Sequence, residues 1–573
     1  MRLKVSKSKN AASLYVIKST YINKVHSTQV VEKLGSEKEL RDKLNGADPY
    51  VWAKEYINKL NEEEKEQKRK VLIPYSQSKL IEMDKQRSFN GGYLFLQKLY
   101  HQLGLHHICK EISQRHSFEY NLDAILSRLI YGRIIFPSSK LSTSDLSKRF
   151  LEQPDFDFHQ VYRALSVIAE ESDFIQKELY LNSLKYSNRK TKVIYYDCTN
   201  YFFEIEEPDV DGDRQYGKCK ENRPNPIVQM GLFMDGNGIP LAFCIDPGNT
   251  NEQVTLKPLE QKLLSDFGMS KFVVCTDAGL ASTSNRKFNN QGERAFITTQ
   301  SIKILKDHLK QWALGTDGWK LPGDDETLYD ISALDETKDF KKTFYKERWI
   351  NENGLEQKLI VTFSLKYKNY QEKIRAGQVE RAQKAIEKNP GKLKKKNAND
   401  FRRFIQESVC TDDGEIAKHK TYGIDALKIS SEAMYDGYYA VCTNLEDDAP
   451  AVIKVNHNRW EIEECFRIMK HEFKARPAYL QRPERIRAHF MTCFLSLVLY
   501  RYLEKALDDK YTCTEIIQTL RDMTFYPAQG EGYIPTYART SLTDSLHEAF
   551  GFRTDYQIVS LQNMKKIYKS TKK

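Results

Sequence analysis

Strand-like and helix-like segments alternate along the chain from Lys192 onward. TKVIYYDCTNYFFEI and KFVVCTDAGLAS are apolar runs typical of buried strands, and NPIVQMGLFMDGNGIPLAFCIDPGN predicts two strands joined at the turn DGNG. LEQKLLSDFG predicts a helix among these strands. Interleaving of this kind indicates a mixed α/β core.

An aspartate stands at the end of each of two predicted strands, Asp197 and Asp277. An aspartate in this position is most often a turn residue or a helix cap. Carboxylates at the ends of neighbouring strands are also well placed to bind Mg²⁺, because Mg²⁺ prefers oxygen ligands. Both interpretations stay open for each residue taken alone.

A third acid lies in the segment NHNRWEIEECFRIMKHEFK, which spans residues 456–474 and predicts a helix. One apolar stripe in it has helical spacing and predicts a buried face: Ile462, Phe466, Met469 and Phe473. A second row has similar spacing and carries one carboxylate among cations: Arg459, Glu463, Arg467 and Lys470. This row is either a solvated face with ion pairs or a place where a metal and phosphates bind.

Two strand-end aspartates and a helix-borne glutamate can together hold a pair of Mg²⁺ ions, for which Mn²⁺ can substitute. Such ions activate a water or a 3′-hydroxyl group and stabilise the leaving oxygen in phosphodiester chemistry. Asp197, Asp277 and Glu463 are therefore the predicted catalytic and metal-binding residues. Glu464, the next residue on the helix, is the alternative ligand.

The composition indicates a globular protein, and its positive charge fits a polyanionic partner but is also common among soluble proteins. The chain has 573 residues, too many for one core, and a formal net charge of +11. Its cysteines are scattered without a C-x-x-C pair, which argues against a zinc site or a disulfide framework. The most apolar run, FMTCFLSLVLYRYL, is interrupted by Arg501 and predicts a buried helix, so we expect no membrane association and a cytoplasmic location.

Shifts in sequence texture predict six regions. They are residues 1–90 with a hairpin and charged helices, 91–190 helical, 191–300 first part of the core, 301–436 a β-rich insertion, 437–510 second part of the core, and 511–573 a C-terminal region for assembly. The helical region carries Arg133, Lys140, Lys148 and Arg149 near its junctions, and is either a DNA-reading bundle or a purely structural one.

The densest basic run, KLKKKNANDFRR, lies within the predicted insertion. It is either an exposed linker or a segment that contacts phosphates. The phosphate interpretation covers positions 393, 395 and 396, which are Leu393, Lys395 and Lys396.

These motifs together resemble the DDE transposases of bacterial insertion sequences, in the group with a Tyr-x2-Arg-x3-Glu-x6-Lys signature. Arg459, Glu463 and Lys470 match its last three positions, whereas Asn456 stands in place of the tyrosine. YYDCTNYFFE and VCTDAGLAS resemble the two aspartate blocks, and RPAYLQRPERIRAHFMTCFLSL resembles the stretch after the glutamate. The resemblance extends from about residue 192 to residue 507.

The resemblance implies an α/β RNase H-like core with a β-rich insertion subdomain, preceded by a mainly α-helical N-terminal region. It implies cleavage of double-stranded DNA at the element's terminal inverted repeats, followed by joining of the 3′-hydroxyl to target DNA. The protein is then expected to be a homodimer on paired ends and to associate with the nucleoid when bound to DNA. Arg459, Lys470 and Arg467 would contact DNA phosphates.

Two other functions stay open at this point. One is a non-catalytic DNA-binding descendant, and the other is an RNase H-like nuclease that cuts without joining. The tryptophans of the insertion, Trp312, Trp319 and Trp349, match no motif, and we expect each to pack in a core.

Overall fold

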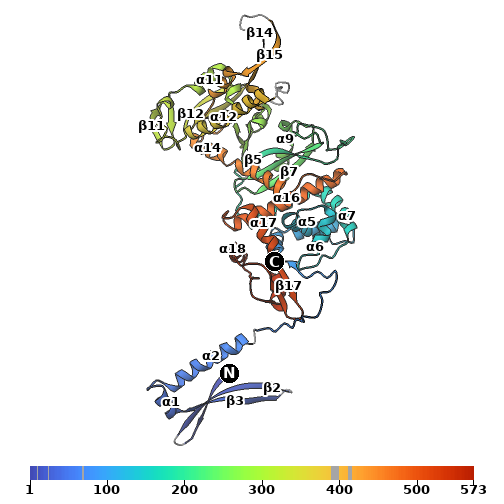
Figure 1. Cartoon of the computed structure of the whole chain (residues 1–573), viewed down its shortest axis with the longest axis vertical. Helices are drawn as coiled ribbons and strands as arrows, with labels where there is room; N and C mark the ends of the chain where they lie inside the picture. Colours follow the sequence, from blue (N-terminus) through green and yellow to red (C-terminus); the bar gives the residue numbers. More distant parts are fainter. Residues whose placement is uncertain (9–10, 23–24, 68–69, 389–398, 411–415) are drawn as a thin grey trace. The chain divides into compact units, whose positions relative to one another are not determined.

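The computed structural model describes residues 1–573 except 9–10, 23–24, 68–69, 389–398 and 411–415. Within this description the chain divides into two compact units. The first is Met1–Lys85 with Pro527–Tyr533, and the second, which we call the body, is Gln86–Tyr526 with Ile534–Lys573. Figure 1 shows the elements and their labels.

The first unit contains a small antiparallel sheet in which β1, β2 and β3 pair in that order. Its elements are β1 (Arg2–Lys7), β2 (Ala12–Ile22), β3 (Val25–Ser36), α1 (Glu37–Lys43) and α2 (Pro49–Gln67). Leu14, Leu40 and Ala53 form its small core. Ser36 and Glu39 close a capping box at the start of α1, which fixes the turn from sheet to helix. The hairpin expected near the N-terminus is present as β2–β3, with β1 added at its edge.

The body begins with a short strand and then a run of helices. These are β4 (Phe89–Asn90), α3 (Tyr93–Gln102), α4 (Leu105–Arg115), α5 (Leu122–Ile135), α6 (Lys140–Ser147), α7 (Phe158–Glu170) and α8 (Ser172–Tyr186). Pro137 separates α5 from α6, because proline cannot continue a helix, and the Ser139 side chain caps α6 by accepting from the Ser142 amide.

A large mixed sheet follows, and among the described residues it has ten strands in the order β11-β10-β12-β13-β16-β9-β8-β5-β6-β7. The first elements along the chain are β5 (Val193–Phe202), β6 (Ile227–Asp235), β7 (Pro240–Pro247), α9 (Glu252–Ser265), β8 (Val273–Thr276), α10 (Thr283–Phe288) and β9 (Ala295–Thr299). β5, β8 and β9 are parallel, whereas β6 and β7 run antiparallel to their neighbours. The mixed α/β architecture expected from the sequence is confirmed.

The predicted insertion shares this sheet with the core. Its elements are α11 (Asp307–Leu314), β10 (Trp319–Leu321), β11 (Asp324–Tyr329), β12 (Phe344–Glu352), β13 (Leu355–Phe363), α12 (Leu365–Lys388), β14 (Ile405–Cys410), β15 (Ile416–Ile424) and α13 (Ala426–Ala433). The next strand, β16 (Tyr438–Thr443), pairs with β13 on one side and with β9 on the other. One continuous ladder therefore joins the two parts, while the proposed residue boundaries stay a prediction.

Helices cover the part of the sheet that contains β5, β6 and β7 on both faces, with α9 on one side and α16 on the other (Figure 1). The elements after the sheet are α14 (Ala449–His457), α15 (Trp460–Arg467), α16 (Pro483–Ala506), α17 (Cys513–Asp522), β17 (Thr524–Ala528), β18 (Gly532–Pro535), α18 (Ser541–Phe550), β19 (Val559–Ser560) and α19 (Leu561–Thr571). α16 contains FMTCFLSLVLYRYL and is buried along most of its length, as the sequence predicted. In the described part of the chain, no helix combines the length and apolarity needed to cross a membrane.

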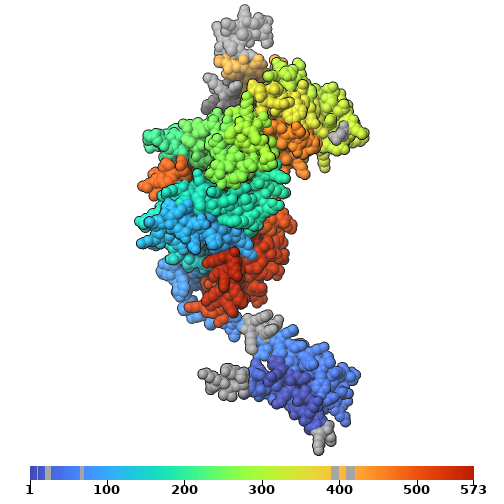
Figure 2. All heavy atoms as spheres, turned by 180° about the vertical axis from the view of Figure 1, so that it is seen from behind, coloured from blue at the N-terminus to red at the C-terminus, as the bar shows by residue number. Residues whose placement is uncertain are grey.

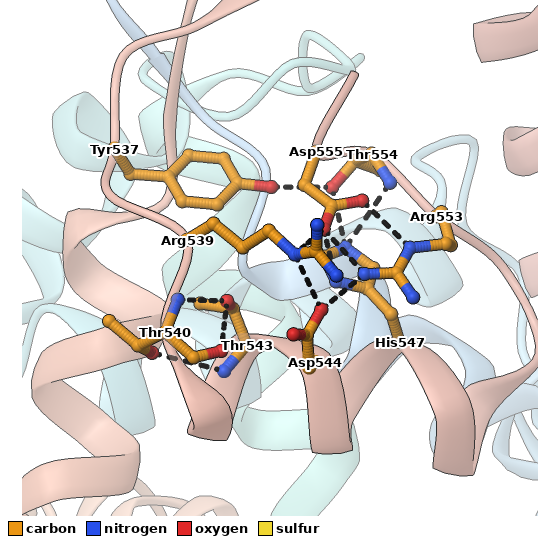
Figure 3. Close-up of polar contacts among 9 residues, drawn as sticks. All are labelled: Tyr537, Arg539, Thr540, Thr543, Asp544, His547, Arg553, Thr554 and Asp555. Atoms are coloured by element: carbon orange, nitrogen blue, oxygen red, sulfur yellow. Dashed lines mark hydrogen bonds and ion pairs between the residues drawn. The ribbon is translucent and has the colours of Figure 1, made fainter.

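The C-terminal helices pack on the start of the body, where α19 lies against α3 (Figure 2). A polar network fixes the turn after α18 (Figure 3). In it Arg539 pairs with Asp544 at 2.8 Å, and Arg553 pairs with Asp555 at 2.7 Å and with Asp544. The hydrogen bonds from Arg553 hold the pKa of Asp555 below its usual value, so this carboxylate stays charged and paired.

Candidate catalytic site

Parallel pairing of β5 with β8 brings the two predicted aspartates side by side. Tyr195 is the register partner of Cys275, and each aspartate lies two residues further along its own strand. Burial is the main cause that raises the pKa of Asp197, to about 6, and the neighbouring charge of Asp277 raises it further. Their positions at strand ends did not decide whether Asp197 and Asp277 are helix caps or metal-binding residues. Asp277 does cap a short turn, because it accepts from the Leu280 amide at 3.2 Å.

Successive side chains of β5 point to opposite faces of the sheet, so its two faces contact different elements. Ile194, Tyr196 and Cys198 lie in the hydrophobic cluster beneath α9. On the opposite face, the Tyr195 hydroxyl donates to the Val455 carbonyl of α14 at 3.0 Å. Asp197 shares this second face and therefore points toward the helices that carry the third acid.

Glu463 lies on helix α15, whose opposite side packs in the core. The predicted apolar stripe is confirmed, because the side chains of Ile462, Phe466, Met469 and Phe473 are all buried. Glu463 is exposed, and one of its carboxylate oxygens lies 3.4 Å from a guanidinium nitrogen of Arg459.

Arg459 lies within electrostatic range of all three acids. Burial by itself lowers the pKa of this guanidinium, but Tyr439, Glu463, Asp197 and Asp277 outweigh burial and raise it. Arg459 therefore pairs with Glu463 and feels the charges of Asp197 and Asp277. The neighbouring Glu464 turns elsewhere and pairs with Arg467 at 2.6 Å. Glu464 and the exposed Arg467 are thus engaged with each other, and the choice of Glu463 as the third acid stays a prediction.

A local change of helix geometry determines where the side chain of Lys470 points. The α-helix gives way at Ile468–Glu472 to a π-helical turn, a wider turn that re-aims the side chains after it. The Lys470 ammonium donates to the Thr199 hydroxyl on β5, two residues beyond Asp197. Burial lowers the pKa of Lys470 to about 8, and the charge of Lys220 acts in the same direction.

Lys220 is a residue of the site that the sequence interpretation missed. Its ammonium donates to the Cys198 carbonyl and lies 3.1 Å from a carboxylate oxygen of Glu252. Its positive charge opposes the burial of Asp197 and lowers the pKa of that aspartate. The available signal was the basic segment GKCKENR between two predicted strands, which has no periodicity to show where its side chains go.

Asn456, which replaces the tyrosine of the signature, is buried beside another tyrosine. Its amide group donates to the Tyr439 hydroxyl at 3.0 Å, and that hydroxyl lies 2.6 Å from the hydroxyl of Thr299. The tyrosine beside this position is therefore Tyr439 of strand β16, and not a residue of the helix that carries Asn456.

Other predicted contact residues lie elsewhere. Leu393, Lys395 and Lys396 fall outside the described residues, and position 393 cannot contribute a cationic side chain because it is a leucine. Trp319 is fully buried and Trp312 packs against the same cluster, as expected. The expectation was wrong for Trp349, which is 44% exposed on β12 with the Lys358 ammonium over its ring.

The donor set fits a hard divalent cation, since carboxylate oxygens are the ligands that Mg²⁺ and Mn²⁺ prefer. Among the described residues, however, no three His, Cys, Asp or Glu side chains stand close enough together to hold a metal ion. The arrangement thus brings the acids into one neighbourhood without the spacing of a closed metal cage.

A family model described as "Transposase DDE domain" matches residues 201–499. The match covers more than half of the chain, includes Asp277 and Glu463, and begins shortly after Asp197. The chain belongs to the DDE transposase family. It is accordingly a DNA transposase.

Solved structures of other transposases resemble this one to different extents. The piggyBac transposase synaptic complex with hairpin DNA is 8% identical with a TM-score of 0.36, covering 85% of this chain and 88% of that one. The Drosophila P element transposase strand transfer complex is 12% identical with a TM-score of 0.18, covering 80% and 92%. The Mos1 transposase paired-end complex is 13% identical with a TM-score of 0.14, covering 30% and 58%. A search of curated proteins found no match.

Proposed function

We propose that this transposase cuts DNA at the ends of its element with Asp197, Asp277 and Glu463 as the ligands of two divalent metal ions. The observation that carries the proposal is the β5–β8 register, which sets Asp197 beside Asp277, together with the pairing of Glu463 with Arg459, whose guanidinium feels the charge of both aspartates. The raised pKa of Asp197 is a further support, because perturbed carboxylates gather at functional sites.

The core around these acids is proposed to be RNase H-like. The support is the strand order β7-β6-β5-β8-β9, in which an antiparallel meander precedes two strands parallel to its first member. Asp197 then lies on the first strand of this core and Asp277 at the end of the next parallel strand. The rest of the sheet is proposed to be the insertion that separates Asp277 from Glu463.

The chain's own cations would hold the DNA strand. Arg459, Lys470 and Lys220 lie around the acids, and each can donate charge-assisted hydrogen bonds to phosphate oxygens. When bound, Mg²⁺ or Mn²⁺ would supply an activated oxygen nucleophile and stabilise the leaving oxygen. The burial of Asp197 and Lys470 would exclude bulk water from one side of the scissile phosphate.

The reaction is proposed to free a 3′-hydroxyl at each terminal inverted repeat of an insertion sequence and to join it to target DNA. Two copies of the chain would act on paired ends in a bacterial cytoplasm. Membership in the DDE family and the net charge of +11 support a DNA substrate.

The test uses full-length protein, a DNA fragment carrying the element's own ends, a supercoiled target plasmid, and Mg²⁺ or Mn²⁺. Wild type is expected to give 3′-hydroxyl nicks at the element boundary and joined products. Glu463→Gln is expected to abolish both, because it removes one metal ligand but preserves the shape of the side chain. Glu464→Gln is the matched control on the same helix and should leave both products.

Loss of nicks in Glu464→Gln but not in Glu463→Gln would overturn the assignment of the third acid. Nicks without joined products in wild type would favour a nuclease that cuts without joining. DNA binding without nicks under either metal would favour a non-catalytic binding protein.

A further inference from the structure

A cavity with both apolar and cationic lining residues lies in the body, between the helical region and the segment that follows the catalytic helix. We call it the junction pocket, and its volume is about 280 Å³. One wall is the turn from α5 to α6, with Arg133, Ser138 and Lys140, and another is the segment from Lys474 to Leu480. This volume is slightly below the roughly 300–1,000 Å³ of sites for drug-sized ligands, so the pocket suits a small group.

Lys140 is the unusual residue of this pocket. Only 5% of it is exposed, and its ammonium makes no hydrogen bond or ion pair with any described residue. Burial lowers the pKa of its ammonium to about 7, and the charge of Arg133 lowers it further. At this depth an ammonium without an ionic partner favours its neutral form, and a bound anion would restore its charge.

Arg133 adds a second cation with unused hydrogen-bonding capacity. It is 4% exposed, and Nη1 donates to the Phe473 carbonyl at 3.1 Å. Its Nε is buried and has no hydrogen-bond partner in the described structure. Arg476 also lines the pocket, where its buried Nη1 lies against Glu221 without forming a hydrogen bond.

The remaining lining offers donors and no competing carboxylate. No aspartate or glutamate is among the described residues that line the pocket. Helix α6 begins at Lys140, and although Ser139 already accepts from the Ser142 amide, the positive end of the helix favours anions here. His489 places Nε2 3.0 Å from the Ala475 carbonyl, and burial holds its pKa well below the usual value, so this ring is neutral.

We infer that the junction pocket binds one phosphate group of a DNA strand through Lys140, Arg133 and the first turn of α6. Phosphate matches the donors, because guanidinium, ammonium and helix amides all bind its oxygens. The DNA source rests on the proposed function and on chain continuity, since the wall from Lys474 to Leu480 continues directly from the helix that carries Glu463 and Lys470. Arg133 and Lys140 therefore bind a phosphate in a pocket of the protein, and they do not contact DNA bases from the surface of a helical bundle.

The first experiment measures binding of inorganic phosphate to full-length protein by calorimetry in EDTA, at matched ionic strength against chloride. Because no metal is present, the result does not depend on cleavage. Lys140→Met is expected to weaken phosphate binding at least tenfold, about the effect of one charge-assisted hydrogen bond. The matched control is Lys148→Met, at the other end of α6, where the exposed lysine pairs with Asp145.

Thermal unfolding without phosphate separates a ligand site from a structural role. If Lys140 is held for a ligand, Lys140→Met raises the Tm of the free protein, because it removes an unpaired buried charge. Lys140→Gln serves as the second variant and should show the same loss of phosphate binding. Absence of phosphate binding by wild type, or equal loss in Lys148→Met, would overturn the site.

The second arm asks whether DNA is the source of the phosphate. Short oligothymidylates with and without a 5′-phosphate are added before the phosphate titration. Competition by both supports a backbone phosphate, and competition only by the 5′-phosphorylated strand supports a strand end. Unchanged phosphate binding in the presence of bound oligothymidylate would overturn the DNA assignment and leave a site for free phosphate or a small phosphate ester.

Discussion

Lys220 adds a cation to the site that was not among the residues predicted from the sequence. It arrives from the connection between β5 and β6 and lies beside the backbone of the strand that carries Asp197. Lys470 approaches the same strand from the catalytic helix. An exposed lysine and a half-buried one near a pair of aspartates are better suited to a phosphate-bearing substrate than to a purely structural network, because each adds a donor for phosphate oxygens.

We therefore expect Lys220→Met to lower the rate of end cleavage by about 10- to 100-fold, the effect of one lost charge-assisted contact in the transition state. Lys218→Met is the matched control, since that lysine is exposed two residues earlier. Single-turnover cleavage of an end-bearing duplex is the measurement. Equal rates for Lys220→Met and wild type would show that Lys220 only supports the fold.

The candidate site shows which residues a sequence can predict. Asp197, Asp277 and Glu463 stand at the ends or on the faces of strongly patterned elements, so their proximity could be anticipated from the order of those elements. Lys220 and Tyr439 could not be anticipated in this way. Lys220 lies in an irregular connection, and Tyr439 reaches the site only because β16 pairs with β9, which is a long-range contact.

At the scale of elements, one buried arginine ties the catalytic helix to the rest of the core. Arg501 on α16 is 4% exposed and pairs with Glu461 of α15 at 2.7 Å and with Glu504 at 2.5 Å. Its Nε also donates to the carbonyl of Gly238, in the turn between β6 and β7. Gly238 adopts a positive φ of 79°, and an added Cβ there would collide with Glu461 and Arg501, so this close approach requires glycine.

Arg501→Met is expected to destabilise the body by about 3–5 kcal/mol, because it leaves two largely enclosed carboxylates, Glu461 and Glu504, without their shared cation. Lys505→Met, four residues further along α16, removes a more exposed pair with Asp509 and should change stability by less than about 1 kcal/mol. Denaturant unfolding followed by circular dichroism measures both. A small effect at Arg501 would mean that water reaches these carboxylates.

Sequence patterning predicted the elements better than their connections. The stripe on α15 and the buried α16 followed from helical periodicity, and the hairpin β6–β7 followed from its turn. The π-helical turn at Ile468–Glu472 was not predictable, because the apolar spacing continues through it without a break. The continuity of the insertion with the core sheet was equally hidden, since strand pairing between β13 and β16 joins residues far apart in the chain.

At the scale of the whole molecule, an exposed connection leads from the first unit into the body. Beyond α2, residues 70–85 form no helix or strand, and Leu72, Leu80 and Met83 are almost fully exposed there. Both units have hydrophobic clusters of their own. Exposed segments without regular structure are the preferred sites of proteolysis.

Brief trypsin digestion of the full chain is expected to cut early at Lys79 and Lys85, before any site within the helices α3 to α8. Mass spectrometry of the early fragments identifies the positions. The helices serve as the internal control, because their lysines are held in hydrogen-bonded backbone. Early cuts between residues 93 and 186, with Lys79 and Lys85 intact, would contradict this division of the chain.

The position of β16 also has a consequence for biosynthesis. This strand lies between β9 and β13 and is made after both, so a nascent chain on the ribosome carries two unjoined half-sheets until residues 438–443 emerge. Each half-sheet then presents an open edge to other chains. The helix with Glu463 is translated directly afterwards. A messenger cut short before that point therefore yields a protein that is both incompletely folded and without its third acid, and truncated copies of the gene would produce no partly active cutter of DNA.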